Sequence, residues 1–217
     1  TGEIVLSLKK ELLLEIMTQS PQLQYSFQGA SHAQTNTMAG VKDGGIVALL
    51  LIYCLLALQF RSYFQPFIIM TAIPFGLVGA LLGHLLMGYN LSIISVLGMV
   101  ALTGIVVNDS LILVDFINRG RDSGVPVRKA VVDAGIRRFR PILLTTLTTF
   151  FGLLPMIFEQ SLQARFLIPM AISLAFGVLF STFVILVLIP TLYMILEDFK
   201  GLFWKEPKKV GVETEIA

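Results

Sequence analysis

The sequence predicts an all-α polytopic membrane protein: a bundle of five transmembrane helices, preceded by a short αβ segment. Hydrophobic residues make up 55% of the 217 residues and charged residues only 14%, and the mean hydropathy is +0.82. A soluble domain carries about 25% charged residues. The apolar residues are gathered in long blocks, and a helix needs about 20 residues to cross the hydrocarbon core of a bilayer.

Residues 1–43 precede the first apolar block and show the pattern of one helix and one strand. In SLKKELLLEIM, Leu8, Leu12 and Ile16 share a helical face; Pro21 ends the run, and LQYSFQ is typical of a short strand. One helix and one strand cannot bury a core alone. We therefore expect residues 1–43 to be the end of a larger extracytoplasmic domain, and the chain to be the carboxy-terminal part of a longer membrane protein.

The helix bundle is expected over residues 44–199, and it is followed by a solvated cytoplasmic tail at 200–217. The third and fifth spans are longer than the bilayer is thick, so they should tilt or extend into water. The five predicted spans are 44–60, 66–87, 91–117, 141–158 and 166–196.

The connection between the third and fourth spans is predicted to contain an amphipathic helix near 125–137. Pro126 suits a first helical turn. The apolar residues at helical spacing are Val127, Ala130, Val131 and Ala134. This helix would lie either on the inner membrane surface, with its basic residues toward lipid headgroups, or against a neighbouring domain.

Lysine and arginine are distributed unequally between the two sides of the membrane. Spans joined by short connections alternate in direction, so each connection belongs to one side. Twelve such residues fall on one side: Arg61, Arg119, Arg121, Arg128, Lys129, Arg137, Arg138, Arg140, Lys200, Lys205, Lys208 and Lys209. Near the membrane on the other side lie Lys42 and Arg165. The positive-inside rule then places the amino-terminal segment outside and the carboxy-terminal tail in the cytoplasm.

An aspartate inside the third span is the first candidate for a functional residue. Asp109 lies in GIVVNDSLILVDF, where a carboxylate near the bilayer centre costs about 2.5 to 3.5 kcal/mol. Three interpretations follow: a group that exchanges protons, a permanently ionised partner of a basic residue, or a protonated interhelical hydrogen bond. Asp115 lies closer to the cytoplasm and is expected to form an ion pair with Arg119 or Arg121. Asn108 shares a face with Asp115 and is turned about 100° from Asp109.

Four threonines enter the fourth span in the segment RPILLTTLTTFFGLLP. Thr145 lies at a depth near that of Asp109, so a contact between the two helices is a reasonable expectation. Each hydroxyl could equally bond a carbonyl of its own helix, as threonine often does in membrane helices. Pro155 should kink this helix near its outer end.

The remaining candidates indicate packing more than chemistry. His84 in the second span is interpreted as a polar contact or, less favourably, a proton relay. Gly79 and Gly83 form a GxxxG pair that predicts close helix packing. Cys54 is the only cysteine and excludes a disulfide within the chain. The sequence shows no metal-ligand spacing, no cofactor motif, no sign of a nucleic-acid partner and no enzyme signature.

The last three spans resemble a known transporter family. The segments GIVVNDSLILVDFINRGRDSG, AGIRRFRPILLTTLTTFFGLLPMIF and IPMAISLAFGVLFSTFVILVLIPTLYMIL are similar to the last three membrane helices of resistance-nodulation-division (RND) efflux permeases, in the hydrophobe/amphiphile branch. The match runs over about 45–197 and is most specific at RPILLT. It implies a parent chain of twelve spans in two similar halves, of which this chain supplies helices 8 to 12. Residues 1–43 would end the second periplasmic porter domain.

The resemblance also implies roles for individual residues. In the family, two aspartates of the fourth helix exchange protons against a tenth-helix lysine, aided by an eleventh-helix threonine and an arginine at the cytoplasmic entry of that helix. The threonine corresponds to Thr145 and the arginine to Arg138. The lysine corresponds to Asn108, which is a departure because a neutral amide cannot neutralise carboxylates. Asp109 adds a negative charge beside it, so the relay would work differently here or couple to another cation.

Family membership further implies a proton-driven antiporter of the bacterial inner membrane, with a periplasmic amino-terminal segment and small amphiphilic substrates. The expected partners are the amino-terminal half of the same transporter, two further copies in a homotrimer, a periplasmic adaptor, an outer-membrane channel and membrane lipid. Two alternatives remain: an accessory membrane subunit of protein secretion from the same superfamily, and a structural membrane module that transports nothing.

The predicted topology can be tested by cysteine labelling. With Cys54 replaced by serine, a cysteine at Ser123 should react only from the cytoplasm, and one at Gln160 only from the periplasm, because the charge asymmetry orients the spans this way. A membrane-impermeant maleimide applied to intact cells makes the measurement. Labelling at position 123 together with protection at position 160 would show that the topology is the reverse of the predicted one.

Overall fold

The computed structural model describes residues 30–161 and 164–203, with side chains over 36–161 and 164–198. The chain forms two compact units, Thr1–Gly40 and Val41–Ala217. Most of the first lies outside the described residues, as do the predicted αβ segment before residue 30 and most of the tail at 200–217. The described residues form six helices: α2 (Ala30–Phe60), α3 (Gln65–Met70), α4 (Ile73–Met87), α5 (Ile93–Asp122), α6 (Val127–Ile157) and α7 (Ala164–Phe203).

The prediction of five membrane-spanning helices is confirmed. Five helical stretches of the described residues are long and apolar enough to cross a bilayer. They are Asn36–Phe60, Gln65–Met87, Ile93–Asp122, Val127–Ile157 and Ala164–Asp198. The described residues contain no strand. The fold class of this part is therefore an all-α polytopic helix bundle.

Two boundaries differ from the prediction. Helix α2 begins at Ala30 and not near residue 44, since no proline interrupts the polar stretch before the first span. The second span is divided into α3 and α4 by a turn at Thr71–Ala72. Pro74, in the first turn of α4, lacks the N–H that would bond the carbonyl of residue 70, so the helix is interrupted there.

The predicted amphipathic helix near 125–137 is not a separate element. It forms the first part of α6, which continues through Pro141 to Ile157, because a proline within a membrane helix can be accommodated by local adjustment. Its apolar face packs into the bundle core through Ala130, Val131 and Ala134, all buried, while Arg128 and Lys129 are exposed. The apolar face therefore covers protein, and the orientation of the exposed basic residues toward lipid headgroups stays a prediction.

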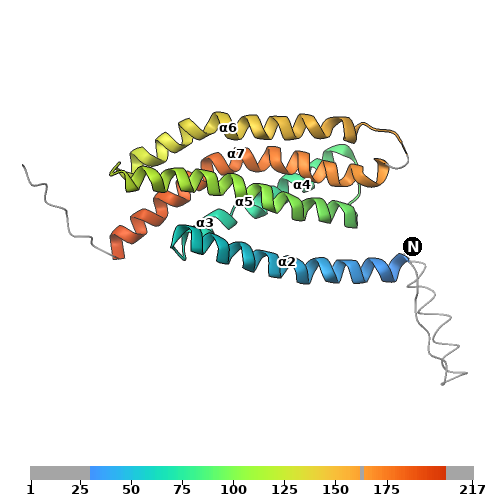
Figure 1. Ribbon diagram of the computed structural model, residues 1–217. Coiled ribbons are helices and arrows are strands. Elements are labelled where there is room, and N and C mark those ends of the chain that lie inside the picture. The colour runs from blue at the N-terminus through green and yellow to red at the C-terminus, as the bar shows by residue number, and fades with distance from the viewer. Residues whose placement is uncertain (1–29, 162–163, 204–217) are drawn as a thin grey trace, which may run out of the picture. The chain divides into compact units, whose positions relative to one another are not determined.

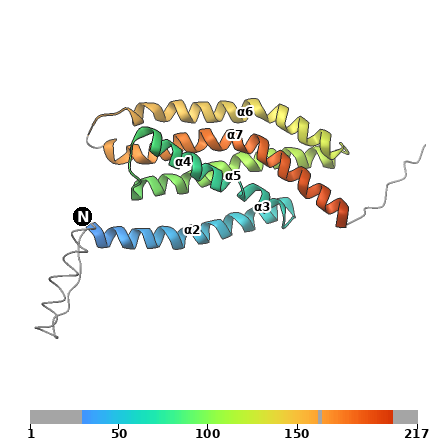
Figure 2. The same ribbon diagram turned by 180° about the vertical axis from the view of Figure 1, so that it is seen from behind.

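Helix α7 is the centre of the bundle. It packs against α4, α5 and α6, and both views show it between α6 and α5 (Figures 1 and 2). The end of α7 turns away from the direction of its first part, and Pro190 lies within this helix (Figure 1). The core side chains between α5 and α7 include Leu113, Ile117 and Ile185, which are fully buried.

Glycines permit the close approach of α4 and α5 to α7. A Cβ atom at Gly79 would lie 3.0 Å from the carbonyl oxygen of Phe176 and 3.2 Å from Cα of Gly177, and one at Gly83 would overlap the Phe176 side chain. A Cβ at Gly98 would lie 2.8 Å from the Met170 carbonyl oxygen. The GxxxG prediction of close helix packing is confirmed at both of its glycines.

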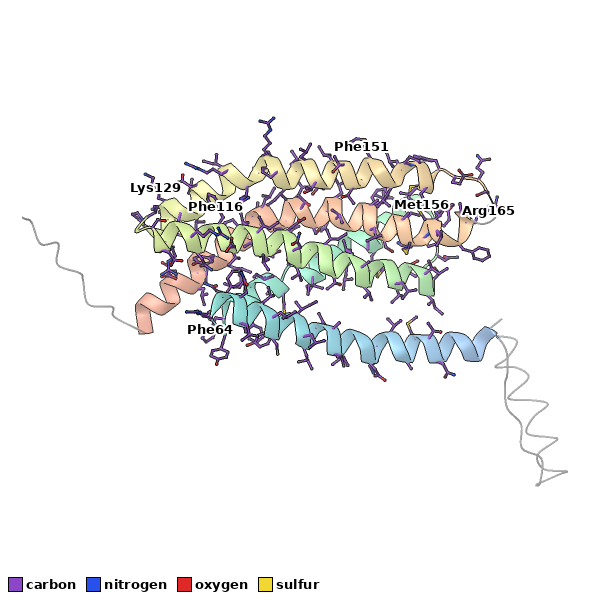
Figure 3. All side chains as sticks on the ribbon, viewed as in Figure 1. Phe64, Phe116, Lys129, Phe151, Met156 and Arg165 are labelled. Carbon is purple, nitrogen blue, oxygen red and sulfur yellow. The ribbon has the colours of Figure 1, made fainter. Side chains whose placement is uncertain are left out.

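The labelled residues identify the two ends of the bundle. Phe64, Phe116 and Lys129 lie at one end, whereas Met156 and Arg165 lie at the other (Figure 3). The first, called the arginine-rich end below, collects the connections α2–α3 and α5–α6 and the end of α7. Helix α2 is mostly exposed; it meets the bundle through buried Leu56 and a ring contact of 5.1 Å between Tyr53 and Phe67.

Glycine substitutions test the packing of α5 on α7. Gly98→Ala should lower the free energy of unfolding by about 1 to 3 kcal/mol, because its methyl group would meet the backbone of Met170. Gly135→Ala in α6 is the matched control, since no atom lies within 4 Å of the added Cβ. Thermal unfolding of the full-length protein in detergent measures both. Equal stability of the two variants would contradict the close approach.

Candidate functional site

Asp109 faces the interior of the bundle from the middle of α5. Its side chain is 8% exposed, and Val106, Ser110 and Leu113 on the same helix are also buried. In the described part of the chain, no side chain donates a hydrogen bond to the Asp109 carboxylate and none forms an ion pair with it. Among the described residues, no basic side chain pairs with Asp109 to keep its carboxylate permanently ionised. The carboxyl group lies in an apolar environment that opposes its ionised form.

The Asn108 side chain faces the surface of the bundle. The rotation of about 100° between neighbouring helical residues turns its amide out of the bundle, and the side chain is exposed. Gly104, one turn before it, is exposed as well, and a Cβ atom added there would meet no other atom within 4 Å. Two adjacent polar side chains of α5 thus face different surroundings, one inside the bundle and one on its surface.

The Thr145 hydroxyl bonds within its own helix. The residue is exposed, and its hydroxyl donates to carbonyl oxygens of α6, at 2.8 Å to Ile142 and 3.2 Å to Pro141. Among the described residues, no hydrogen bond joins Thr145 to α5, the helix of Asp109. The buried threonine is its neighbour Thr146, whose hydroxyl lies 2.7 Å from that of Thr182 on α7. Thr146 and Thr182 therefore join α6 to α7.

Arg138 lies seven residues before Thr145, about 10 Å along α6. Its guanidinium lies over the ring of Phe116 on α5, 4.9 Å from the ring centroid, a cation–π contact. The Nε atom is buried and has no hydrogen-bond partner in the described structure. Beside it, a pocket of about 420 Å³ lies between α5 and the start of α6 and is also lined by Asp133 and Arg137. Arg138 is thus held against α5 at the arginine-rich end.

The expected ion pair of Asp115 is confirmed. Its Oδ2 accepts a hydrogen bond of 2.8 Å from Nε of Arg119, one helical turn away. The Arg119 side chain is 76% exposed. An exposed pair of this kind contributes about 1 kcal/mol or less. Asp115 is therefore a helix-end carboxylate with a local partner, unlike Asp109.

The interpretation of His84 as a polar contact is also confirmed. The ring is buried, with Nδ1 3.0 Å from the Ala80 carbonyl oxygen and Nε2 2.9 Å from the Ser95 hydroxyl. Because a carbonyl oxygen only accepts, Nδ1 is the donor. Ser95 and Ser92 form the capping box that begins α5, so His84 fixes the start of this helix against α4.

The sequence interpretation missed a polar network at the arginine-rich end. Gln65 of α3 and Asn118 of α5 bond each other twice, at 3.0 and 2.9 Å, and the Tyr193 hydroxyl of α7 donates to Asn118 at 2.7 Å. Arg121 donates to the Tyr193 hydroxyl at 3.2 Å and to Glu197 at 2.6 Å. The sequence does place polar residues at the same end of three spans. Which of them bond one another depends on how each helix is rotated about its axis, and the sequence pattern does not give that rotation.

This geometry can be compared with known proteins. Residues 4–197 match the model of the AcrB/AcrD/AcrF family. The chain belongs to this family. The predicted resemblance to RND efflux permeases is thereby confirmed.

Individual relatives are much longer than this chain. It is 31% identical over 191 residues to multidrug resistance protein MdtC of Edwardsiella ictaluri, covering 86% of this chain and 18% of that protein. It is 30% identical over 212 residues to MdtC of Salmonella paratyphi B, covering 96% and 21%. Two crystal structures of a heavy metal efflux pump are similar in fold. The first has a TM-score of 0.71 at 29% identity, and the match covers 86% of this chain and 19% of the pump. The second has a TM-score of 0.67 at 27% identity, and the match covers 88% of this chain and 19% of the pump. The chain spans about a fifth of each.

The Tyr193 hydroxyl provides a test of the polar network. Tyr193→Phe should lower the free energy of unfolding by about 1 to 3 kcal/mol, because it removes the donor to Asn118 and the acceptor for Arg121 while keeping the buried ring. Thr191→Val is the control, since its exposed hydroxyl bonds only the Val187 carbonyl of its own helix. Chemical denaturation of the full-length protein gives both values. A Tyr193 variant as stable as the control would show that the network contributes nothing.

Proposed function

We propose that this chain is the carboxy-terminal part of the membrane domain of a proton-driven RND exporter, a secondary active transporter and not an enzyme. The observation that carries the proposal is Asp109, a carboxyl group 8% exposed inside an apolar bundle with no ion pair among the described residues. Such a group is unfavourable in a membrane helix. A proton-exchange function, in which the carboxyl takes up a proton in one conformation and releases it in another, would explain why an acid is kept here despite the free-energy cost of burying it.

The exposed polar side chains support contact with the remaining amino-terminal half of the transporter. Asn108, Thr145 and Thr148 lie on surfaces of spans that would otherwise meet hydrocarbon. An amide facing lipid has no hydrogen-bond partner, whereas one facing another helix bundle can find one. We place the relay next to this contact: Asp109, inside the bundle, exchanges the proton, and Asn108 and Thr145 supply polar groups toward the other half. Arg138 lies at the arginine-rich end.

The domain arrangement proposed for the complete protein follows the same reasoning. Residues 1–43 end a periplasmic porter domain, 44–199 form the bundle, and 200–217 form a cytoplasmic tail. The Lys and Arg asymmetry supports an inner-membrane location with the amino-terminal segment in the periplasm. Small amphiphilic substrates are proposed because MdtC is named a multidrug resistance protein. A homotrimer with a periplasmic adaptor and an outer-membrane channel completes the proposal.

Charge-removing substitutions test the role of Asp109 in the full-length protein. Asp109→Asn should abolish or strongly impair efflux, because the amide cannot carry a proton between conformations. Asp115→Asn is the matched control and should be mild, since it removes only an exposed ion pair worth about 1 kcal/mol or less. Thr145→Ala should fall between them. Drug susceptibility of cells with equal amounts of each variant in the membrane is the measurement.

Efflux by everted vesicles then identifies the coupling ion. Dye efflux driven by a pH gradient should be lost in the Asp109 variant and kept in the Asp115 variant. Wild-type resistance with Asp109→Asn would make this carboxyl structural and exclude it from coupling. Efflux that follows a sodium gradient and ignores the pH gradient would replace the proton by another cation.

A further inference from the structure

A second polar pocket lies at the arginine-rich end, away from Asp109. Its volume is about 590 Å³, and it is formed where α2 ends and α3 begins, against the last turns of α5. The charged residues of its wall are Arg61, Asp115, Arg119, Arg121 and Asp122, and Gln65 and Asn118 add amides. The wall therefore contains guanidinium groups, carboxylates and amides together.

Most of these groups have partners in the protein. Gln65 and Asn118 bond each other, and Arg119 is paired with Asp115. Arg121 donates to Tyr193 and Glu197 of α7. Arg61 and Asp122 are different: both side chains are exposed, and neither forms a hydrogen bond or ion pair with the described residues. Within the described structure, the pocket thus presents one unpaired cation and one unpaired anion.

The backbone at Arg61 is strained. Its φ is 49°, and it is the one residue other than glycine with positive φ in the described part of the chain. The left-handed conformation is unfavourable for a side chain with a Cβ atom and recurs at ligand-binding sites. Here it ends α2 and brings Arg61 to the wall of the pocket.

The surroundings of the pocket are those of a membrane interface. Tyr63, Phe64 and Phe67 are exposed on the connection and first turn next to Arg61, and Figure 3 shows Phe64 at this end of the bundle. Aromatic rings are enriched at the level of lipid headgroups. The last turns of α2 expose Leu55 and Leu58, which can contact acyl chains. A lipid is therefore the ligand whose polar and apolar parts both find a matching surface.

We propose that this pocket binds the headgroup of phosphatidylethanolamine, with the phosphate toward Arg61 and the primary ammonium toward Asp122. A guanidinium binds phosphate oxygens through paired N–H groups. An ammonium group donates to a carboxylate through its N–H bonds. Phosphatidylglycerol offers no cation for Asp122, and the quaternary ammonium of phosphatidylcholine has no N–H to donate. The proposal is independent of the transport function and of the coupling ion.

Native mass spectrometry of the full-length protein in detergent tests this site. The protein is titrated with phosphatidylethanolamine, phosphatidylglycerol or phosphatidylcholine of identical acyl chains, and the first bound lipid is counted. Phosphatidylethanolamine should bind about two- to fivefold more tightly than the other two, the factor expected for one exposed ion pair. Equal binding of the three lipids would overturn the proposal.

Variants assign the preference to the two unpaired groups. Arg61→Gln should weaken binding of all three lipids about two- to fivefold, and Arg61→Lys should largely retain it. Asp122→Asn should reduce phosphatidylethanolamine binding to the level of phosphatidylglycerol. Arg128→Gln and Asp198→Asn are the controls, because neither residue lines the pocket and Arg128 is exposed. If the Arg61 and Asp122 variants bind the three lipids as the control variants do, the proposed lipid site is wrong.

A soluble headgroup separates a lipid site from a site for free phosphate compounds. O-Phosphoethanolamine carries the same phosphate and ammonium without acyl chains. At the concentration of the lipid it should displace little of the bound phosphatidylethanolamine, since it cannot use the apolar surface of α2. Full displacement would show that the pocket recognises a small soluble molecule, and the lipid proposal would fail.

Discussion

The contact of α4 and α5 with the central helix α7 is the constraint on which the rest of the bundle depends. Lipid tails are as apolar as leucine, so burial of apolar side chains does not by itself draw membrane helices together. Close packing has to supply the attraction, and the glycines at positions 79, 83 and 98 allow backbones to approach within van der Waals contact of α7. These contacts set the rotation of α4 and α5 about their own axes.

That rotation decides which polar groups are inside. With Gly98 against α7, the face of α5 that carries Leu102, Val106 and Asp109 is buried, and Asn108 is turned outward. In α6 the same logic buries Thr146 against Thr182 and leaves Thr145 on the surface. A buried carboxyl and a surface of exposed polar groups therefore follow from helix packing, and together they underlie the proposed coupling site.

Polar networks complete the positions of the helices at both ends. His84 and the Ser92–Ser95 capping box hold α4 to the start of α5. At the other end Asn118, Tyr193 and Arg121 link α5 to α3 and α7. These bonds lie near the ends of the spans, where the groups can also meet water, while the middle of the bundle is packed by small and apolar residues. The exceptions are the neutral hydroxyl pair of Thr146 and Thr182 and the carboxyl group of Asp109.

The sequence by itself determined the number of spans, their order and the family, because long apolar blocks and specific segments such as RPILLT depend on composition and local order. It also identified Gly79 and Gly83 as packing sites and Asp115 as a locally paired acid, since their partners lie at helical spacing or follow from a known motif. Only the tertiary structure decided that Thr146 is buried and Thr145 is not, that 127–137 continues into α6, and that Arg61 and Asp122 share one pocket. Those outcomes depend on helix rotation and on residues far apart in sequence, and a periodic pattern contains neither.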